Sequence, residues 1–191
     1  MTKDNIIYLP NPHLRQQSQR ITDFSAITKD LVGNMVGATL DWEASRPFEV
    51  GAALAAVQLD ELKRIIIVRS DFDNKESKEF TTLINPRIVQ HDGELVYDHE
   101  GCLSVKDVYG YVPRYTKVKV AAQDLEGNDV RIVADGFLAR VLQHEIDHTN
   151  GIVFIDHIKS NPQAFFTLSQ QGELIQLDYD KEIKASRILW N

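Results

Sequence analysis

The sequence predicts an α+β fold, built from antiparallel strands and two main helices. Residues 117–124 and 129–134 are strand-like and flank a short polar turn, which predicts a β-hairpin. Apolar residues at helical spacing begin after Gly136, and this helix is expected to end at Gly151. A longer helix is expected from about 25 to 44, where Leu31 and Met35 lie four positions apart.

The other expected elements are shorter. Residues 64–68 (RIIIV) and 81–90 are typical of strands, the second interrupted near Asn85-Pro86, and 152–156 (IVFID) also has β character. The tail is expected to hold a short helix within 160–172 and a strand-like alternation over 173–184. Because no repeat or linker interrupts the chain, we expect a single domain spanning 1–191.

Composition excludes several classes of protein. The chain has 191 residues, of which 43% are hydrophobic and 26% charged, so it can bury a core. Its formal net charge of -7 argues against nucleic acid as a direct partner, which needs clustered Lys and Arg. The first residues lack the long apolar region of a signal peptide, and no apolar run is long enough to cross a membrane. We therefore expect a cytoplasmic location without membrane association.

The segment QHEIDH, residues 143–148, has the spacing of a metal site. Four residues along a helix place His144 and His148 on one face, where both imidazoles can reach one ion. Glu145 then lies beside the ion, where it can act as a general base. The alternative is a helix surface that carries three polar side chains without a metal.

A catalytic metal site needs a third protein ligand. In one metalloprotease class the third ligand is a histidine at the position that Phe154 occupies here. In another class the third ligand is a glutamate further along the chain, for which Glu173 is the candidate. His157 is near in sequence, although nothing sets its geometry. The remaining candidate is Cys102, the single cysteine of the chain. A thiolate with two imidazoles suits iron, cobalt, nickel or zinc.

Three ordered segments resemble the motifs of the peptide deformylases. They are GAALAAVQ at 51–58, EGCLS at 100–104 and QHEIDH at 143–148. The resemblance covers about residues 8–158, so 160–191 would be a C-terminal extension of the same domain. It implies antiparallel β-sheets packed around a central helix that carries the HEIDH metal-binding motif.

The resemblance also implies an activity and a cofactor. It predicts a metal-dependent hydrolase that removes the N-terminal formyl group from formyl-methionyl nascent polypeptides and releases formate. The metal would be Fe(II), with nickel, cobalt or zinc able to substitute, held by Cys102, His144 and His148. The ribosome is a further candidate partner for residues 160–191, although the tail contains no basic helix that would argue for it.

Roles for further residues follow from the same resemblance. Glu145 would be the general base, while the side-chain amide of Gln58 and the backbone N–H of Leu103 would stabilise the oxyanion. The expected substrate-binding residues are Gly51, Ala52, Ala53 and Val141. For Leu54 and Leu142, core packing is the favoured interpretation.

Polar neighbours of these motifs have expected supporting roles. Glu100 and Asp147 could accept an imidazole N–H and so orient a ring, although Asp147 could instead pair on the helix surface. Arg114 could pair with Glu100.

The chain departs from the family motifs at four places: Ala53, Val57, Lys106-Asp107 and Thr149. If Ala53 needed a positive φ, its methyl group would be strained. The departures leave two other functions open, which are a degenerate homologue that binds formyl-peptides without turnover and a zinc endopeptidase.

Overall fold

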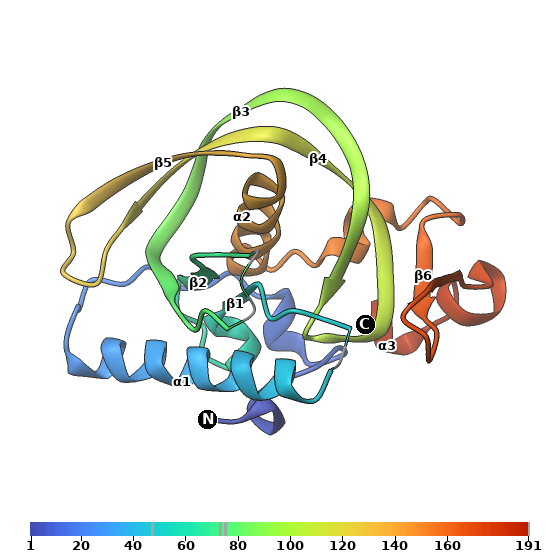
Figure 1. Cartoon of the computed structure of the whole chain (residues 1–191), viewed down its shortest axis with the longest axis horizontal. Helices are drawn as coiled ribbons and strands as arrows, with labels where there is room; N and C mark the ends of the chain where they lie inside the picture. Colours follow the sequence, from blue (N-terminus) through green and yellow to red (C-terminus); the bar gives the residue numbers. More distant parts are fainter. Residues whose placement is uncertain (47, 73, 75, 191) are drawn as a thin grey trace.

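The computed structural model describes residues 1–46, 48–72, 74 and 76–190, with the backbone alone at 26 and 27. Within them, one sheet curves around helix α2 (Gly136–Thr149), and helix α1 (Ala26–Ala44) lies outside it (Figure 1). The strands are β1 (Ala53–Ala55), β2 (Ile65–Arg69), β3 (Phe80–Cys102), β4 (Val105–Gln123), β5 (Asp129–Asp135), β6 (Phe165–Leu168) and β7 (Leu174–Gln176). The short helix α3 (Arg187–Trp190) ends the described chain.

The sheet is antiparallel throughout, in the order β1-β2-β3-β4-β6-β7, and β5 also pairs with β4. The β3–β4 ladder is long, and its register shifts at four places. Such irregularities bend a strand and increase its twist. The ribbon therefore arches over α2 and brings the β3–β4 turn back toward that helix (Figure 1).

Strand β2 separates two of the three hydrophobic clusters of the described interior, because its side chains alternate between the two faces of the sheet. Ile66 and Val68 pack with residues of α2, including Leu142 and Ile146. Ile65 and Ile67 pack with residues of α1. The sequence predictions of an α+β fold, the 117–134 hairpin and both main helices are confirmed.

Two predictions in the C-terminal third are wrong. Residues 152–156 form no strand, because the chain turns into a 3-10 helix at Phe154–Ile158 that buries its apolar side chains. Residues 165–168 are strand β6, which pairs with β4, where we expected a short helix. The alternation over 173–184 is a strand only in β7, and a π-helical turn follows at Tyr179–Ile183. Short apolar runs do not distinguish helix from strand by periodicity.

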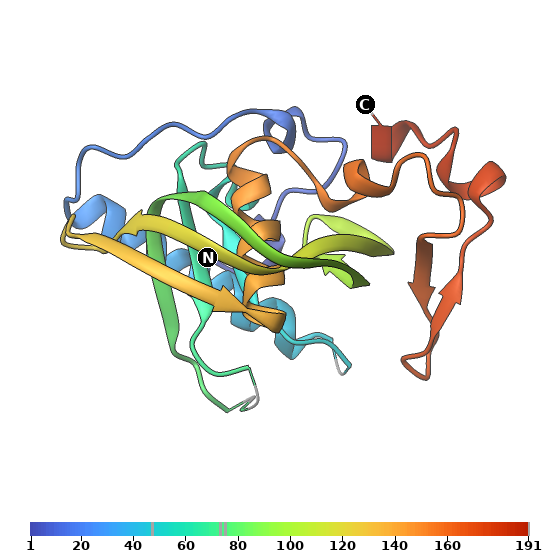
Figure 2. The same cartoon turned by 90° about the horizontal axis from the view of Figure 1, so that it is seen from above.

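The tail lies to one side of the arch (Figure 2). Its hairpin of β6 and β7 joins the sheet through Tyr109 and Gly110 of β4. Among the described residues, no helix has both the length and the apolar character needed to cross a membrane.

Candidate active site

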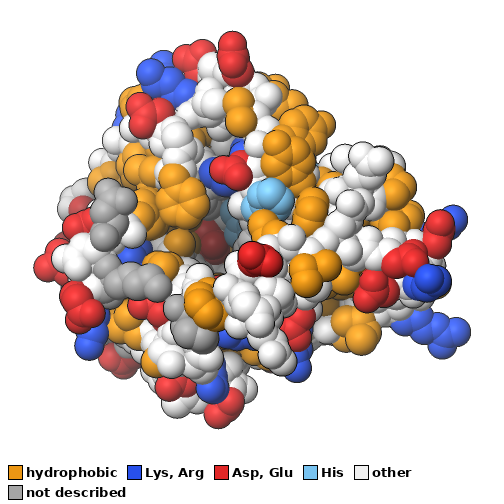
Figure 3. Space-filling view, turned by 45° about the vertical axis from the view of Figure 1, so that its right-hand side comes forward, with side chains coloured by type: hydrophobic (Ala, Val, Ile, Leu, Met, Phe, Trp, Pro, Cys, Tyr) orange, Lys and Arg blue, Asp and Glu red, His pale blue; other side chains and the backbone are white. Residues whose placement is uncertain are grey.

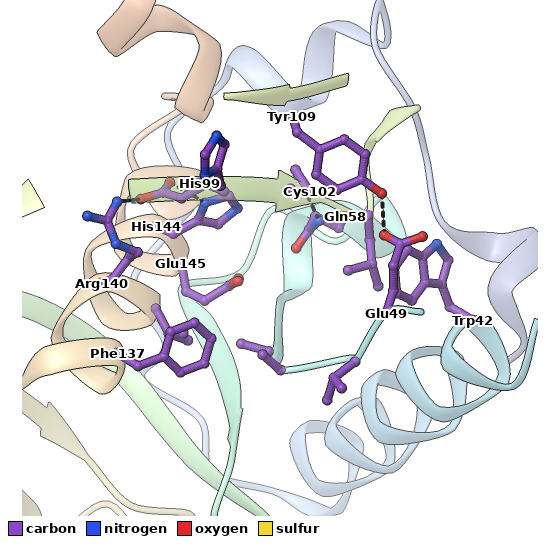
Figure 4. A pocket seen from close by; sticks show the side chains of 17 residues that line it. Trp42, Glu49, Gln58, His99, Cys102, Tyr109, Phe137, Arg140, His144 and Glu145 are labelled. Carbon is purple, nitrogen blue, oxygen red and sulfur yellow. Dashed lines mark hydrogen bonds and ion pairs between the residues drawn. The ribbon is translucent and has the colours of Figure 1, made fainter. Parts of the chain in front are cut away.

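A cavity of about 290 Å³ opens beside α2 and is bordered by β1 and by the end of β3. Figure 3 shows a hollow on this face of the molecule, with hydrophobic side chains gathered at its rim. Gln58, Cys102, His144 and Glu145 all line the cavity, and Figure 4 shows them directed toward its interior. Segments almost 90 residues apart in sequence therefore meet at one place.

Three potential metal-ligand atoms lie close together beside this cavity, which Cys102 and His144 line and His148 does not. The Sγ atom of Cys102 and one ring nitrogen each of His144 and His148 lie within 4.8 Å of one another. The Nε2 atom of His148 is 3.2 Å from Sγ. His148 is fully buried, and burial lowers its pKa well below the usual value, with the neighbouring His144 acting in the same direction. A neutral imidazole is the form that binds a metal.

Glu100 orients the first of these histidines. Its Oε2 atom accepts a hydrogen bond from Nδ1 of His144 at 3.0 Å, which leaves the other ring nitrogen toward Cys102. Arg114 contacts both carboxylate oxygens of Glu100, at 2.9 and 3.0 Å. Burial alone would raise the pKa of Glu100, but the hydrogen bonds from His144 and Arg114 hold it well below its usual range. The expected supporting geometry of Glu100 and Arg114 is thus present.

Arg140 completes this network and was missed by the sequence analysis. It lies one helical turn before His144, and its Nη1 atom donates to Oε1 of Glu100 at 2.8 Å. It also donates to the carbonyl oxygens of Val96 and Val112. The sequence signal that could have identified Arg140 is that it is a single arginine on the apolar side of the predicted helix. Arg140 ties α2 to the β3–β4 ribbon through the residue that orients His144.

Asp147 and His157 lie outside the cluster of donor atoms. Oδ2 of Asp147 is 2.7 Å from Nε2 of His157 and also accepts from Arg114. Asp147 therefore pairs with an imidazole other than the two on its own helix. Glu173 precedes β7 in the tail. Phe154, which occupies the position of a histidine in one protease class, stacks on the ring of His144 instead.

Glu145 is buried at the side of the cavity. Its Oε2 atom has no hydrogen-bond partner among the described residues, although the side chain is only 5% exposed. Burial raises the pKa of this carboxyl to about 7. An oxygen in this setting is suited to exchange a proton with a molecule in the cavity.

Gln58 presents its amide nitrogen to the site. The backbone N–H of Ala55 donates to Oε1 at 2.9 Å, which fixes that end of the amide as the oxygen. The nitrogen then faces Oγ of Ser104 at 3.1 Å and Sγ of Cys102 at 3.6 Å. Leu103 lines the cavity between these two residues of the second motif. The Gln58 amide nitrogen is therefore a donor next to the sulfur.

The four expected substrate-binding residues differ in their positions. Ala52, Ala53 and Val141 line the cavity, whereas Gly51 does not. Ala53 has no positive φ, so its methyl group causes no backbone strain. Leu54 and Leu142 are fully buried in the two clusters that β2 separates, which confirms the packing interpretation.

The backbone of Gly51 is held by an ion pair between the partly buried Glu43 and the fully buried Arg69. The Oε2 atom of Glu43 accepts the Gly51 N–H at 2.7 Å and pairs with Arg69. Arg69 also donates to the Gly51 carbonyl oxygen at 3.2 Å and to the carbonyl oxygen of Ser77. The ion pair thus fixes the chain that leads into β1.

Other residues line the cavity without any signal in their sequence context. They are Trp42, Glu49, His99, Tyr109 and Phe137. The Tyr109 hydroxyl donates to Oε2 of Glu49, an interaction drawn in Figure 4. Burial and this hydrogen bond raise the pKa of Tyr109. The contact joins the loop before β1 to β4 across one end of the cavity.

Comparisons with known proteins agree on one family. The polypeptide deformylase family model matches residues 3–164. A peptide deformylase of Brachyspira hyodysenteriae is 48% identical over 59% of this chain and 61% of its own length. One from Thermomicrobium roseum is 42% identical, covering 91% of this chain and 96% of its own. The crystal structure of a Synechococcus elongatus peptide deformylase with actinonin superimposes with a TM-score of 0.74 at 33% identity, covering 82% of this chain and 80% of that one.

Proposed function

Because the chain belongs to the polypeptide deformylase family, we propose that it is a hydrolase that removes the N-terminal formyl group from formyl-methionyl polypeptides. The observation that carries this proposal is the grouping of Cys102, His144 and His148 beside a cavity that Cys102, His144 and Glu145 line. Formate would be the second product. The fold and the family model support the reaction class, and the residue roles below are our assignment.

Cys102, His144 and His148 fit a divalent transition metal, since they offer one sulfur and two imidazole nitrogens close together. The fourth position would stay open for water or substrate. We assign Fe(II) as the physiological ion, with nickel, cobalt or zinc as substitutes. The bound ion would supply a Lewis acid that makes water acidic near neutral pH. The backbone N–H of Ser104 donates to Sγ of Cys102 at 3.4 Å.

Glu145 would move the proton. As a carboxylate, it would take a proton from water as the oxygen attacks the formyl carbon. Burial raises its pKa to about 7 in the metal-free protein, and a bound cation would lower this value and favour the carboxylate. After the tetrahedral intermediate forms, Glu145 would return the proton to the departing amine.

Gln58 and Leu103 would stabilise the charge that develops on the formyl oxygen. The Gln58 amide nitrogen already faces the sulfur ligand, and its oxygen is held by Ala55. The backbone N–H of Leu103 follows Cys102 directly in the chain. Preorganised donors of this kind lower the barrier because they need no rearrangement during the reaction.

The substrate backbone would lie along β1. This strand is at the end of the sheet order and pairs only with β2 among the described strands, so its other edge can accept a peptide. Ala52, Ala53 and Val141 would contact the methionine side chain. Gly51 would act by positioning the strand, since Glu43 and Arg69 hold both of its backbone groups.

The two other functions are less well supported. A zinc endopeptidase with a third histidine is disfavoured, because Phe154 occupies that position and packs on His144. A degenerate homologue was motivated by Ala53, and that residue is unstrained. We place the enzyme in the cytoplasm, and docking to a ribosome stays a prediction.

The proposed function can be tested by measuring formate. Protein loaded with iron or nickel without oxygen is given formyl-Met-Ala-Ser, and both formate and new amines are quantified. We expect formate in equal amount to free Met-Ala-Ser. Cleavage of an internal peptide bond without formate would indicate an endopeptidase. Peptide binding with neither product would indicate a degenerate homologue.

A further inference from the structure

A second hollow, of about 220 Å³, lies on the sheet and shares no lining residue with the active-site cavity. Three arginines line it, and each comes from a different segment. Arg20 belongs to the extended N-terminal segment, Arg87 to β3 and Arg131 to β5. Asp129 is the one carboxylate among the residues that line the hollow. The excess positive charge is notable in a chain whose formal net charge is -7.

The strand register explains why two of these arginines converge. Arg87 pairs with Ala121 of β4, and Ala121 pairs with Arg131 on its other side. Directly paired residues project from the same face of a sheet. The next residue of β4 on either side, Val120 or Ala122, is buried in the core with α2, so Ala121 faces outward. The small alanine leaves space between two guanidinium groups on strands about 10 Å apart.

Arg20 is brought to the same hollow by a buried amide. Asn85 has a φ of 54° and exchanges two hydrogen bonds of 2.8 Å with the backbone of Ile21, the residue after Arg20. Its Nδ2 atom also donates to Gln123. Asn85 and Gln123 both line the hollow. The N-terminal segment is therefore anchored to β3 and β4 at this point.

These arginines differ from the others in the chain. Of the ten arginines, six form side-chain hydrogen bonds or ion pairs within the described structure. Within the described residues the remaining four form no such side-chain contact, and three of those four line this hollow. Arg87 and Arg131 carry like charges on the same face of the sheet, with only Ala121 between them, and a bound counter-charge would relieve their repulsion. The arrangement thus favours an anionic ligand.

The geometry points to a phosphate group as that ligand. A guanidinium donates two parallel hydrogen bonds to a pair of phosphate oxygens, and three guanidinium groups from different directions match a tetrahedral anion better than a planar carboxylate. We propose that the hollow formed by Arg20, Arg87 and Arg131 binds a dianionic phosphate group. Its source is inorganic phosphate or the terminal phosphate of a small ester. A concave site lined by three cations suits a compact ligand more than a long polyanion.

The test is a titration of the full-length ¹⁵N-labelled protein with inorganic phosphate at constant ionic strength. We expect saturable shifts of the amide signals of Arg87, Ala121 and Arg131. Arg87→Gln or Arg131→Gln should each weaken binding about tenfold, and the double variant should abolish it. Arg187→Gln is the matched control, because Arg187 also forms no side-chain hydrogen bond or ion pair within the described residues but lies outside the hollow. The affinity of this variant for phosphate should equal that of the wild type.

Other outcomes would overturn the proposal. Equal shifts with chloride would show only screening of exposed charge. Shifts confined to Cys102, His144 and His148 would place the phosphate at the metal. Retained affinity in the double variant would place it elsewhere. Tight binding of a uridine oligonucleotide, with no response to phosphate or ribose 5-phosphate, would identify an RNA backbone as the partner instead.

The folding of each variant is checked in the same spectra. Unchanged amide signals away from the substituted residue would establish that the variant folds.

Discussion

Glu145 is the residue on which the proposed chemistry depends most. It lies between the two proposed ligand histidines in sequence, yet its Oε2 atom has no partner in the described structure. We expect Glu145→Gln to retain its metal, because the three donor atoms are unchanged. Formate release should fall by about 10²–10⁴-fold or more. Metal analysis and a formate assay on the same sample measure both. Loss of metal together with activity would instead make Glu145 a ligand.

The pKa of Glu145 predicts how activity depends on pH. Burial raises the pKa to about 7, and only the ionised form accepts a proton, so activity should fall as the pH is lowered through this pKa. A bound cation favours the carboxylate, so the midpoint in the metal-loaded enzyme should lie below pH 7. The measurement is kcat/KM against pH, with the metal content checked at each point. Constant activity down to about pH 5 at full metal loading would contradict this prediction.

Arg140 is predicted to act through Glu100 and His144. Replacing it in Arg140→Met removes one donor from Glu100 and leaves the carbonyl oxygens of Val96 and Val112 without that partner. Outer contacts of this kind typically change metal affinity by about 10–100-fold. We expect weaker metal binding, measured by competition with a chelator well below the unfolding temperature.

The matched variant for this position is Arg140→Lys. It keeps the charge and one donor, so it should recover part of the lost affinity. Unchanged metal affinity in Arg140→Met, with only a lower unfolding temperature, would reduce Arg140 to a structural role.

At the scale of elements, the stability of helix α2 depends on Gly151, the glycine that follows its C-terminal end. Gly151 has a φ of 75°, and a Cβ atom there would lie 2.6 Å from the carbonyl oxygen of Arg15. Gly151→Ala should therefore lower the free energy of unfolding by about 1–3 kcal/mol or more. The measurement is denaturant unfolding of the metal-free protein.

Gly33 provides the control for that substitution. It lies inside α1, and a Cβ atom there would meet nothing within 4 Å. Gly33→Ala should stabilise the protein by about 0.5–1 kcal/mol, because alanine is the better helix former. Equal effects of the two substitutions would show that neither the backbone angle nor the contact at Gly151 matters.

Strand β1 shows how one element depends on distant neighbours. Its three residues form hydrogen bonds to β2 on one side, and the other edge borders the cavity. The approach to the strand is fixed by Glu43 from α1 and by Arg69 at the end of β2. Neither residue has a sequence signal that links it to the first motif. The ion pair could be found only from the fold.

For the whole molecule, regular elements with clear periodicity were predictable. The α1 and α2 helices and the β4–β5 hairpin follow from apolar spacing and turn residues. The tail was not predictable, because Phe165–Leu168 becomes a strand only by pairing with β4. Phe154–Ile158 has strand-like composition but forms a 3-10 turn that buries its apolar side chains. In both segments, tertiary contacts rather than local sequence determine the secondary structure.

The candidate site likewise has a part that was predictable from the sequence and a part that depends on tertiary contacts. Motif residues Gln58, Cys102, His144, Glu145 and His148 are adjacent in space, as their resemblance to a family implied. The residues that support them come from outside the motifs, so their contacts depend on the arching of β3 and β4. Arg140 on α2 and the Tyr109–Glu49 contact are the main examples.

The central claim is that one sulfur and two imidazoles hold a catalytic metal beside Glu145. X-ray absorption at the metal edge of the nickel- or cobalt-loaded protein tests it most directly. We predict one sulfur neighbour and two imidazole nitrogens, with the sulfur lost in Cys102→Ser. A wild-type spectrum with only nitrogen and oxygen neighbours would contradict the account, because the HEIDH histidines would then hold the ion without Cys102.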